Sequence, residues 1–151
     1  MSARILIIED NPTNMELMEY LLQAFGHTPL YANDGLEGVE AALKLMPDLI
    51  ICDVHIPKLD GYGVVRQIKA KKPLSMIPVI AVTAMAMVGD REKLITAGFD
   101  SYIAKPIDPE NFMDQIEKFL PQHLRSSAPS EPSPVKPGVP AVVAISLDEE
   151  R

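Results

Sequence analysis

Residues 49–53 read LIICD, four consecutive apolar residues followed by an aspartate. The runs Ile5–Ile8 and Val79–Val82 have the same continuous apolar, β-branched character, and weaker runs occur at Thr28–Ala32 and Tyr102–Ala104. A run that is continuous rather than alternating is typical of a strand covered on both faces. The sequence therefore predicts five strands, of which three are fully buried.

Helical patterns fill the intervals between these runs. Apolar residues recur at three- and four-residue steps in five sets, which are Met15, Met18, Leu22 and Phe25; Ala41, Ala42 and Leu45; Val64, Val65 and Ile68; Leu94, Ile95 and Ala97; and Phe112, Ile116, Phe119 and Leu120. Pro12 suits a helix start, Gly26 a helix stop, and Asp108-Pro109 an N-cap followed by the first helical residue. Five βα units in about 120 residues predict an α/β fold with a doubly wound parallel sheet. The flavodoxin-like order 2-1-3-4-5 is one common solution, and periodicity does not choose among orders.

The composition of the chain excludes several classes of protein. The 151 residues carry a formal net charge of −7 and one cysteine. An acidic balance disfavours binding to nucleic acid or to anionic membranes, and no internal disulfide or zinc-ligand cluster is available. No apolar stretch approaches the roughly 18 residues of a membrane span, and the run Ile5–Ile8 ends at Glu9 instead of continuing as a signal peptide. These features predict a soluble protein of the cytoplasm.

The end of the sequence differs from the rest in composition. Of the 14 prolines, five lie in SSAPSEPSPVKPGVP at residues 126–140, together with four serines. Such a segment has little to bury and favours extended conformations. We therefore predict a folded domain over residues 1–122 and a flexible, Pro/Ser-rich tail over residues 123–151. Within that tail, the apolar residues 141–147 are a possible docking segment that adds as a strand to a partner.

Polar residues end four of the five predicted strands. Glu9 and Asp10 follow the first run, Asp53 the third, Thr83 the fourth and Lys105 the fifth. Because ligands of doubly wound sheets bind at the carboxyl ends of the strands, these residues are the candidate site. Two carboxylates about 4 Å apart repel by about 4 kcal/mol at an effective dielectric constant of 20. Without a cation, at least one pKa should be raised, and hard oxygen ligands of this kind suit Mg²⁺.

Each of these residues taken singly also has an ordinary structural interpretation. Glu9 and Asp10 can be solvated or can favour the start of the following helix, and Lys105 can be a surface lysine. His55 either points the same way as Asp53 or faces solvent in the loop, which we favour. Cys52 should point away from Asp53 and be buried. The joint pattern of acids, hydroxyl and ammonium at one edge of a sheet favours function, with Asp53 as a carboxylate nucleophile toward phosphorus.

Four segments resemble one known family. These are IEDNPTN (residues 8–14), DVHIPKLDGYGV (53–64), PVIAVTAMAM (78–87) and YIAKPID (102–108). Together they are similar to the receiver domains of two-component response regulators, in the same order and over about residues 3–120. The stretch VTAMAMVGD is most similar to the DivK-type group of single-domain regulators, and chemotaxis-type regulators share the pattern. The resemblance implies the flavodoxin-like (βα)5 fold with strand order 2-1-3-4-5.

The resemblance also implies a role for each matching residue. Asp53 is the expected phosphoacceptor, and Mg²⁺ is expected on Asp10 and Asp53 directly, on Glu9 through water and on the backbone carbonyl of His55. Thr83 and Lys105 are expected to contact the phosphoryl group, and the Lys105–Pro106 peptide bond is expected to be cis. Tyr102 matches the switch aromatic that responds with Thr83, although a half-buried strand aromatic is the plainer interpretation.

The expected function is therefore that of a signalling switch and not of an enzyme acting on other substrates. The resemblance implies phosphoryl transfer from a histidine kinase or a phosphotransfer protein, and output to a downstream protein through the fourth helix, fifth strand and fifth helix, in a monomer or weak dimer.

Three alternatives stay open. A dehalogenase-type phosphatase requires a second aspartate at the position where this chain has His55. A flavin or nucleotide carrier requires a glycine- or hydroxyl-rich first loop, whereas the loop EDNPTN of this chain is acidic. In the third alternative the chain is a receiver cut from a larger hybrid kinase, with the Pro/Ser segment as its linker.

Overall fold

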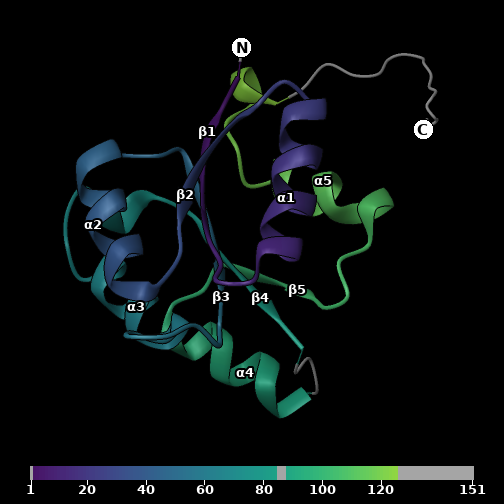
Figure 1. Ribbon diagram of the computed structural model, residues 1–151. Helices are drawn as coiled ribbons and strands as arrows, with labels where there is room; N and C mark the ends of the chain where they lie inside the picture. Colours follow the sequence, from purple (N-terminus) through teal and green to yellow (C-terminus); the bar gives the residue numbers. More distant parts are fainter. Residues whose placement is uncertain (1, 85–87, 126–151) are drawn as a thin grey trace.

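The computed structural model describes residues 2–84 and 88–125 and contains a five-stranded sheet, whose arrangement can be followed in Figure 1. All neighbouring strands run parallel, and their order is β2-β1-β3-β4-β5. This is the flavodoxin-like order, so the predicted fold class is confirmed. The strands are β1 (Arg4–Ile8), β2 (Thr28–Ala32), β3 (Leu49–Asp53), β4 (Val79–Thr83) and β5 (Ser101–Ala104).

Helices cover both faces of the sheet, as a doubly wound fold requires. In Figure 1, α1 and α5 lie together on one side of the strands, and α2 and α3 lie on the other, with α4 at the lower end of the view. The helices are α1 (Pro12–Ala24), α2 (Gly35–Leu45), α3 (Gly61–Lys69), α4 (Val88–Ala97) and α5 (Pro109–Glu117), and short 3₁₀ turns occupy Leu74–Met76 and Gln122–Leu124.

Local sequence explains several of the helix ends. The side chain of Asn11 accepts a hydrogen bond from the backbone N–H of Asn14 at 3.0 Å, and Pro12 is the first helical residue of α1. Asp108 caps α5 in the same way, with Pro109 next. Gly26 takes a φ of +83° just after α1, a conformation that costs little without a Cβ. The predicted helix start at Pro12, helix stop at Gly26 and cap at Asp108 are confirmed.

The core forms two layers, one on each face of the sheet. Every residue of β3 and β4 is buried, and so are four of the five in β1, which confirms the meaning of the continuous apolar runs. Because side chains alternate along a strand, Ile50 and Cys52 pack with α2, α3 and α4, whereas Leu49 and Ile51 pack with α1 and α5.

Two of the predicted apolar helix faces are wrong in detail. Leu45 is 37% exposed because it is the last residue of α2, where Met46 turns the chain with a φ of +48°. The buried face of α2 consists of Gly35, Gly38, Val39 and Ala42, of which Ala42 was predicted, and a Cβ at Gly38 would come within 2.5 Å of the Ile8 side chain. In α4, Leu94 faces the core, so Ile95, rotated by about 100°, is 51% exposed.

Some sequence predictions fall outside the described residues. These concern the tail after residue 125, with its possible docking segment 141–147, and residues 85–87 of the segment PVIAVTAMAM. The boundary after residue 122 stays a prediction. Over residues 2–84 and 88–125, the structure has no helix with both the length and the apolar character needed to cross a membrane.

Candidate functional site

The predicted site residues lie at the carboxyl ends of four adjacent strands. Glu9 and Asp10 follow β1, Asp53 and Thr83 are the last residues of β3 and β4, and Lys105 follows β5. Since β1, β3, β4 and β5 are neighbours in that order, the parallel sheet brings these residues to one edge.

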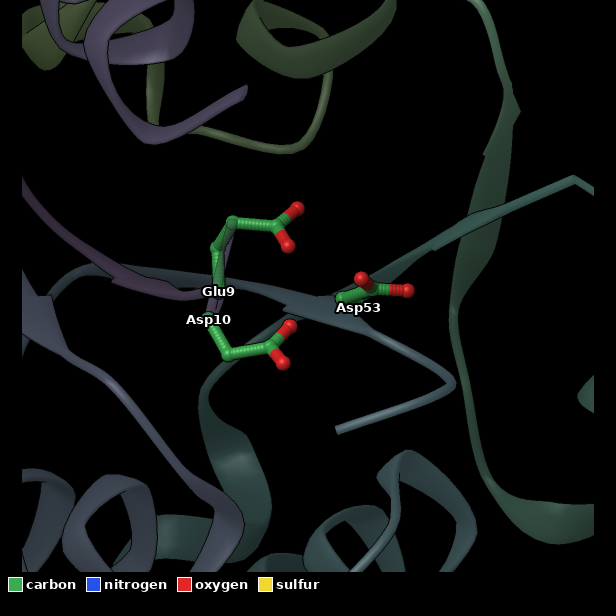
Figure 2. Close-up of side chains that lie close together, drawn as sticks. All are labelled: Glu9, Asp10 and Asp53. Carbon is green, nitrogen blue, oxygen red and sulfur yellow. The ribbon is translucent and has the colours of Figure 1, made fainter. Parts of the chain in front are cut away.

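Three carboxylates converge at this edge. Figure 2 shows Glu9, Asp10 and Asp53 grouped at the ends of their strands, and one oxygen of each lies within 4.8 Å of the others. Glu9 is 1% exposed and Asp53 4% exposed, whereas Asp10 is open to solvent. The predicted convergence of three acids is therefore what the structure contains, with two of them buried.

Burial and mutual repulsion change the ionisation of this cluster. The pKa of Glu9 is raised to about 7, chiefly because burial disfavours the charged form and further because of the Asp53 carboxylate. The Asn11 N–H, which donates to Glu9 Oε2 at 3.1 Å, and the Lys105 ammonium act in the opposite direction. A raised pKa among these acids was predicted from their mutual repulsion; it belongs to Glu9, where burial contributes more to the shift than the Asp53 carboxylate does.

Lys105 supplies the positive charge nearest to the acids. Its Nζ donates to Asp53 Oδ2 at 2.9 Å and lies 3.9 Å from Glu9 Oε1. Its backbone N–H donates to the carbonyl of Thr83 at 2.8 Å, which joins the end of β5 to that of β4. The next peptide bond, Lys105–Pro106, is cis.

The residues present fit a divalent cation. Glu9 Oε1 is buried and has no hydrogen-bond partner among the described residues, which is costly for a charged oxygen. Within the part of the chain that the structure describes, the Lys105 ammonium is the one cation paired with these three carboxylates, so the cluster retains an excess of negative charge. Carboxylate oxygens at this spacing are ligands suited to a hard dication such as Mg²⁺ or Ca²⁺.

The loop after β3 contacts the Asp53 side chain through its backbone. The backbone N–H of His55 donates to Asp53 Oδ1 at 3.2 Å, and the side chain of His55 is exposed, as we favoured. Cys52 is buried as predicted, and burial raises the pKa of its thiol well above the ordinary value. The structure explains why residue 61 is a glycine. A Cβ at this position would come within 2.8 Å of the Asp53 carbonyl oxygen and 2.7 Å of Val54 Cα.

Thr83 and Tyr102 lie on one face of the sheet. Tyr102 pairs with Ala81, two residues before Thr83, and side chains two apart on a strand share a face. Thr83 is 2% exposed, and Tyr102 is half-buried against the core layer of α2, α3 and α4. Sequence reasoning missed Arg91 of α4, whose guanidinium carbon lies 5.6 Å from the centre of the Tyr102 ring. No local pattern marks this contact, because Arg91 is an exposed residue on another element.

A parallel α/β sheet with acids, a hydroxyl and a lysine at its carboxyl edge is typical of receiver domains. The chain belongs to this family, because residues 5–117 match the response regulator receiver domain. Among its relatives is the polar-differentiation response regulator DivK of Brucella ovis, 39% identical over 120 residues that cover 80% of this chain and 98% of the relative. DivK of Brucella anthropi is also 39% identical, with the same coverage.

Solved structures agree with the family. The receiver domain of a sensor histidine kinase from Pseudomonas aeruginosa, determined with a magnesium ion coordinated in its active-site cleft, is 34% identical with a TM-score of 0.73. The match covers 79% of this chain and 98% of that one. The chemotaxis response regulator CheY4 of Vibrio cholerae has a TM-score of 0.76 at 23% identity, over 80% of this chain and 100% of that one, and shares the fold.

Proposed function

We propose that this receiver domain is a Mg²⁺-dependent phosphorylation switch in which Asp53 accepts a phosphoryl group from a phosphohistidine. One observation carries the proposal. Asp53 is 4% exposed at the carboxyl edge of the sheet, with the Lys105 ammonium 2.9 Å from Oδ2 and the Glu9 and Asp10 carboxylates beside it. An oriented carboxylate of this kind is a nucleophile for phosphorus whose surroundings can neutralise charge on the transferred group.

In the proposed reaction, an Asp53 carboxylate oxygen forms a bond to phosphorus while the bond from phosphorus to the histidine nitrogen breaks. The imidazole leaves with the electron pair of that bond and takes a proton from solvent. Lys105 exchanges its contact with Asp53 for one with a phosphoryl oxygen, and the hydroxyl of Thr83 donates to another. Bound Mg²⁺ would neutralise phosphoryl charge, held by Asp10 and Asp53, by the backbone carbonyl of His55 and, through water, by Glu9.

The proposed output is a change in protein contacts. The acyl phosphate adds a charge of about −1.5 to −2, which draws Thr83 toward the site and makes room for Tyr102 to move along the same face. The surface formed by α4, β5 and α5 then changes its preference for a downstream protein. Moving such an equilibrium from 1:99 to 99:1 takes about 5.5 kcal/mol. In this proposal the chain works in the cytoplasm and catalyses only its own phosphorylation and slow dephosphorylation.

The relatives support parts of the proposal. Magnesium is bound in the active-site cleft of the Pseudomonas receiver domain, which is 34% identical to this chain. The Brucella relatives are response regulators of polar differentiation, in keeping with a donor that is a sensor histidine kinase or a phosphotransfer protein.

The test is phosphoryl uptake by the full chain. Purified protein is mixed with Mg²⁺ and either acetyl phosphate or a phosphorylated histidine kinase, and the acid- and base-labile mass gain of one phosphoryl group is followed by intact-protein mass spectrometry. Asp53→Asn should abolish uptake. Asp114→Asn, which removes the same charge from an exposed position on α5, should leave uptake unchanged. Undiminished uptake by Asp53→Asn would exclude the proposal, and turnover of a generic phosphate ester would favour a phosphatase.

A further inference from the structure

The side chains of helix α4 that the structure describes make few apolar contacts with the rest of the domain. Of its side chains that the structure describes, at residues 89–97, Leu94 is the one that is buried. A groove of about 470 Å³ separates part of α4 from α3. By contrast, α1, α3 and α5 each bury at least three residues. Contacts made by the polar side chains of α4 therefore make up a larger share of its attachment than in those helices.

Two cationic side chains of α4 reach over aromatic rings of different neighbours. The Arg91 guanidinium carbon lies 5.6 Å from the centre of the Tyr102 ring on β5. Lys93 Nζ lies 5.2 Å from the centre of the Tyr62 ring on α3, and that ring packs edge-on against Phe99. Both distances fall within the range of about 6 Å for cation–π attraction. Residues two apart on a helix point about 200° apart, so the two contacts hold α4 from opposite sides.

The contact with Arg91 involves the ring that lies nearest to Thr83 along this face of β5. The register pairs Tyr102 with Ala81 and Ala104 with Thr83, so Tyr102 and Thr83 are diagonal neighbours on one face of two adjacent strands. A ring that moves along this face toward Thr83 changes its distance from Arg91. In the position that the structure records, the ring lies within cation–π range of Arg91.

We propose that Arg91 is a positioning residue for Tyr102, and that its contact with the ring sets how much of the unphosphorylated protein occupies the switched state. This inference rests on the proposed function, because it assigns Tyr102 to the switch. In this inference Arg91 acts through the ring, and it stands on α4 and not at the strand ends that carry Glu9, Asp53 and Lys105. Loss of one exposed cation–π contact corresponds to a change of about two- to fivefold in the equilibrium constant.

The first test observes the ring directly. The full chain is labelled with 3-fluorotyrosine, and its four tyrosines are assigned in ¹⁹F NMR spectra by single Tyr→Phe variants. Mg²⁺ with beryllium fluoride serves as the phosphoryl mimic and should shift the Tyr102 resonance of the parent protein. Arg91→Gln should move the resting Tyr102 resonance part of the way toward that position, and Arg91→Lys should stay near the parent. Lys93→Gln, the matched control, should move the Tyr62 resonance and leave that of Tyr102 in place.

The second test measures coupling to function. Arg91→Gln should raise the initial rate of phosphoryl uptake from acetyl phosphate by about two- to fivefold, and it should have no such effect in a Tyr102→Leu background. The inference would be overturned if the Tyr102 resonance did not move in Arg91→Gln, or if it moved equally in Lys93→Gln. It would also be overturned if Arg91→Gln raised the uptake rate as much in the Tyr102→Leu background as in the parent. A parent protein that responds to neither beryllium fluoride nor acetyl phosphate would instead overturn the proposed function, and the resting spectra would still report on the Arg91 contact.

Discussion

Replacement of Glu9 by glutamine should stabilise the cation-free protein at alkaline pH. Glu9 is 1% exposed, and its pKa is raised from 4.5 to about 7. Below pH 4.5 the carboxyl is protonated in the folded and unfolded states alike. Between that value and pH 7 the folded state holds a proton that the unfolded state has lost, so the free energy of unfolding falls as the pH rises. At 1.36 kcal/mol per pKa unit, this difference reaches about 3 kcal/mol above pH 7.

Glutamine removes this penalty with little change of shape. Its side-chain oxygen can still accept the hydrogen bond that the Asn11 N–H donates to Glu9 Oε2. The Glu9→Gln protein should therefore match the parent near pH 4.5 and exceed its free energy of unfolding by up to about 3 kcal/mol at pH 8. Because the chain has no tryptophan, urea unfolding is best followed by circular dichroism, with EDTA present.

Two comparisons make this prediction specific. Asp10→Asn removes the same charge from an exposed position in the cluster, so it should stabilise the protein much less. Mg²⁺ at about 100 times its dissociation constant should stabilise the parent by about 2.7 kcal/mol and should stabilise Glu9→Gln by less. A difference between Glu9→Gln and the parent that is independent of pH, or a variant less stable than the parent at pH 8, would refute this account of the cluster.

Three further predictions concern residues outside the acidic cluster. His27→Ala should lower the free energy of unfolding by about 1–3 kcal/mol, because buried His27 Nδ1 accepts from the Ala3 N–H at 3.0 Å while Nε2 contacts Glu117 Oε2 at 2.7 Å. In the same urea titration, His27→Asn should lower the free energy of unfolding by less, because its side-chain oxygen can accept from the Ala3 N–H. Gly61→Ala should lower the free energy of unfolding by about 1–3 kcal/mol and slow phosphoryl uptake from acetyl phosphate, since its Cβ would press on the backbone of Val54 and Asp53. An unchanged melting temperature and uptake rate would contradict this prediction and show that the loop accommodates the extra methyl group. Removal of residues 126–151 should leave uptake at the parental rate, and a chain that no longer accepts phosphate would make the tail part of the switch.

Much of the fold could be predicted from local sequence, because the pattern of apolar residues in each strand shows which of its faces are covered. The run Leu49–Cys52 is apolar on both faces since helices cover both faces of the sheet, and the polar residue after it marks the strand end. Convergence of Glu9, Asp53 and Lys105 then follows from parallel strands. The sequence does not show that Glu9 is buried while its neighbour Asp10 is exposed, because both follow the end of β1, where the alternation of a strand no longer fixes which side chain points inward.

Sequence patterns did not predict contacts between side chains that are far apart in the chain. His27 and Glu117 are 90 residues apart, and neither stands in a motif. The contact of Arg91 with Tyr102 depends on how α4 is rotated, and that same rotation exposes Ile95, which periodicity had placed in the core. Helix rotation is set by packing between elements, and a short helix with one buried leucine gives a weak pattern from which to predict it.

The order of the strands gives the site a further property. Its residues run from Glu9 to Lys105 along the chain and come from β1, β3, β4 and β5, so no short fragment contains it. A break in the connection between α2 and β3 would leave Glu9 and Asp10 on one fragment, and Asp53, Thr83 and Lys105 on the other. If the proposed phosphorylation holds, uptake by such a pair of fragments would require the two halves to reassemble through the β1–β3 pairing.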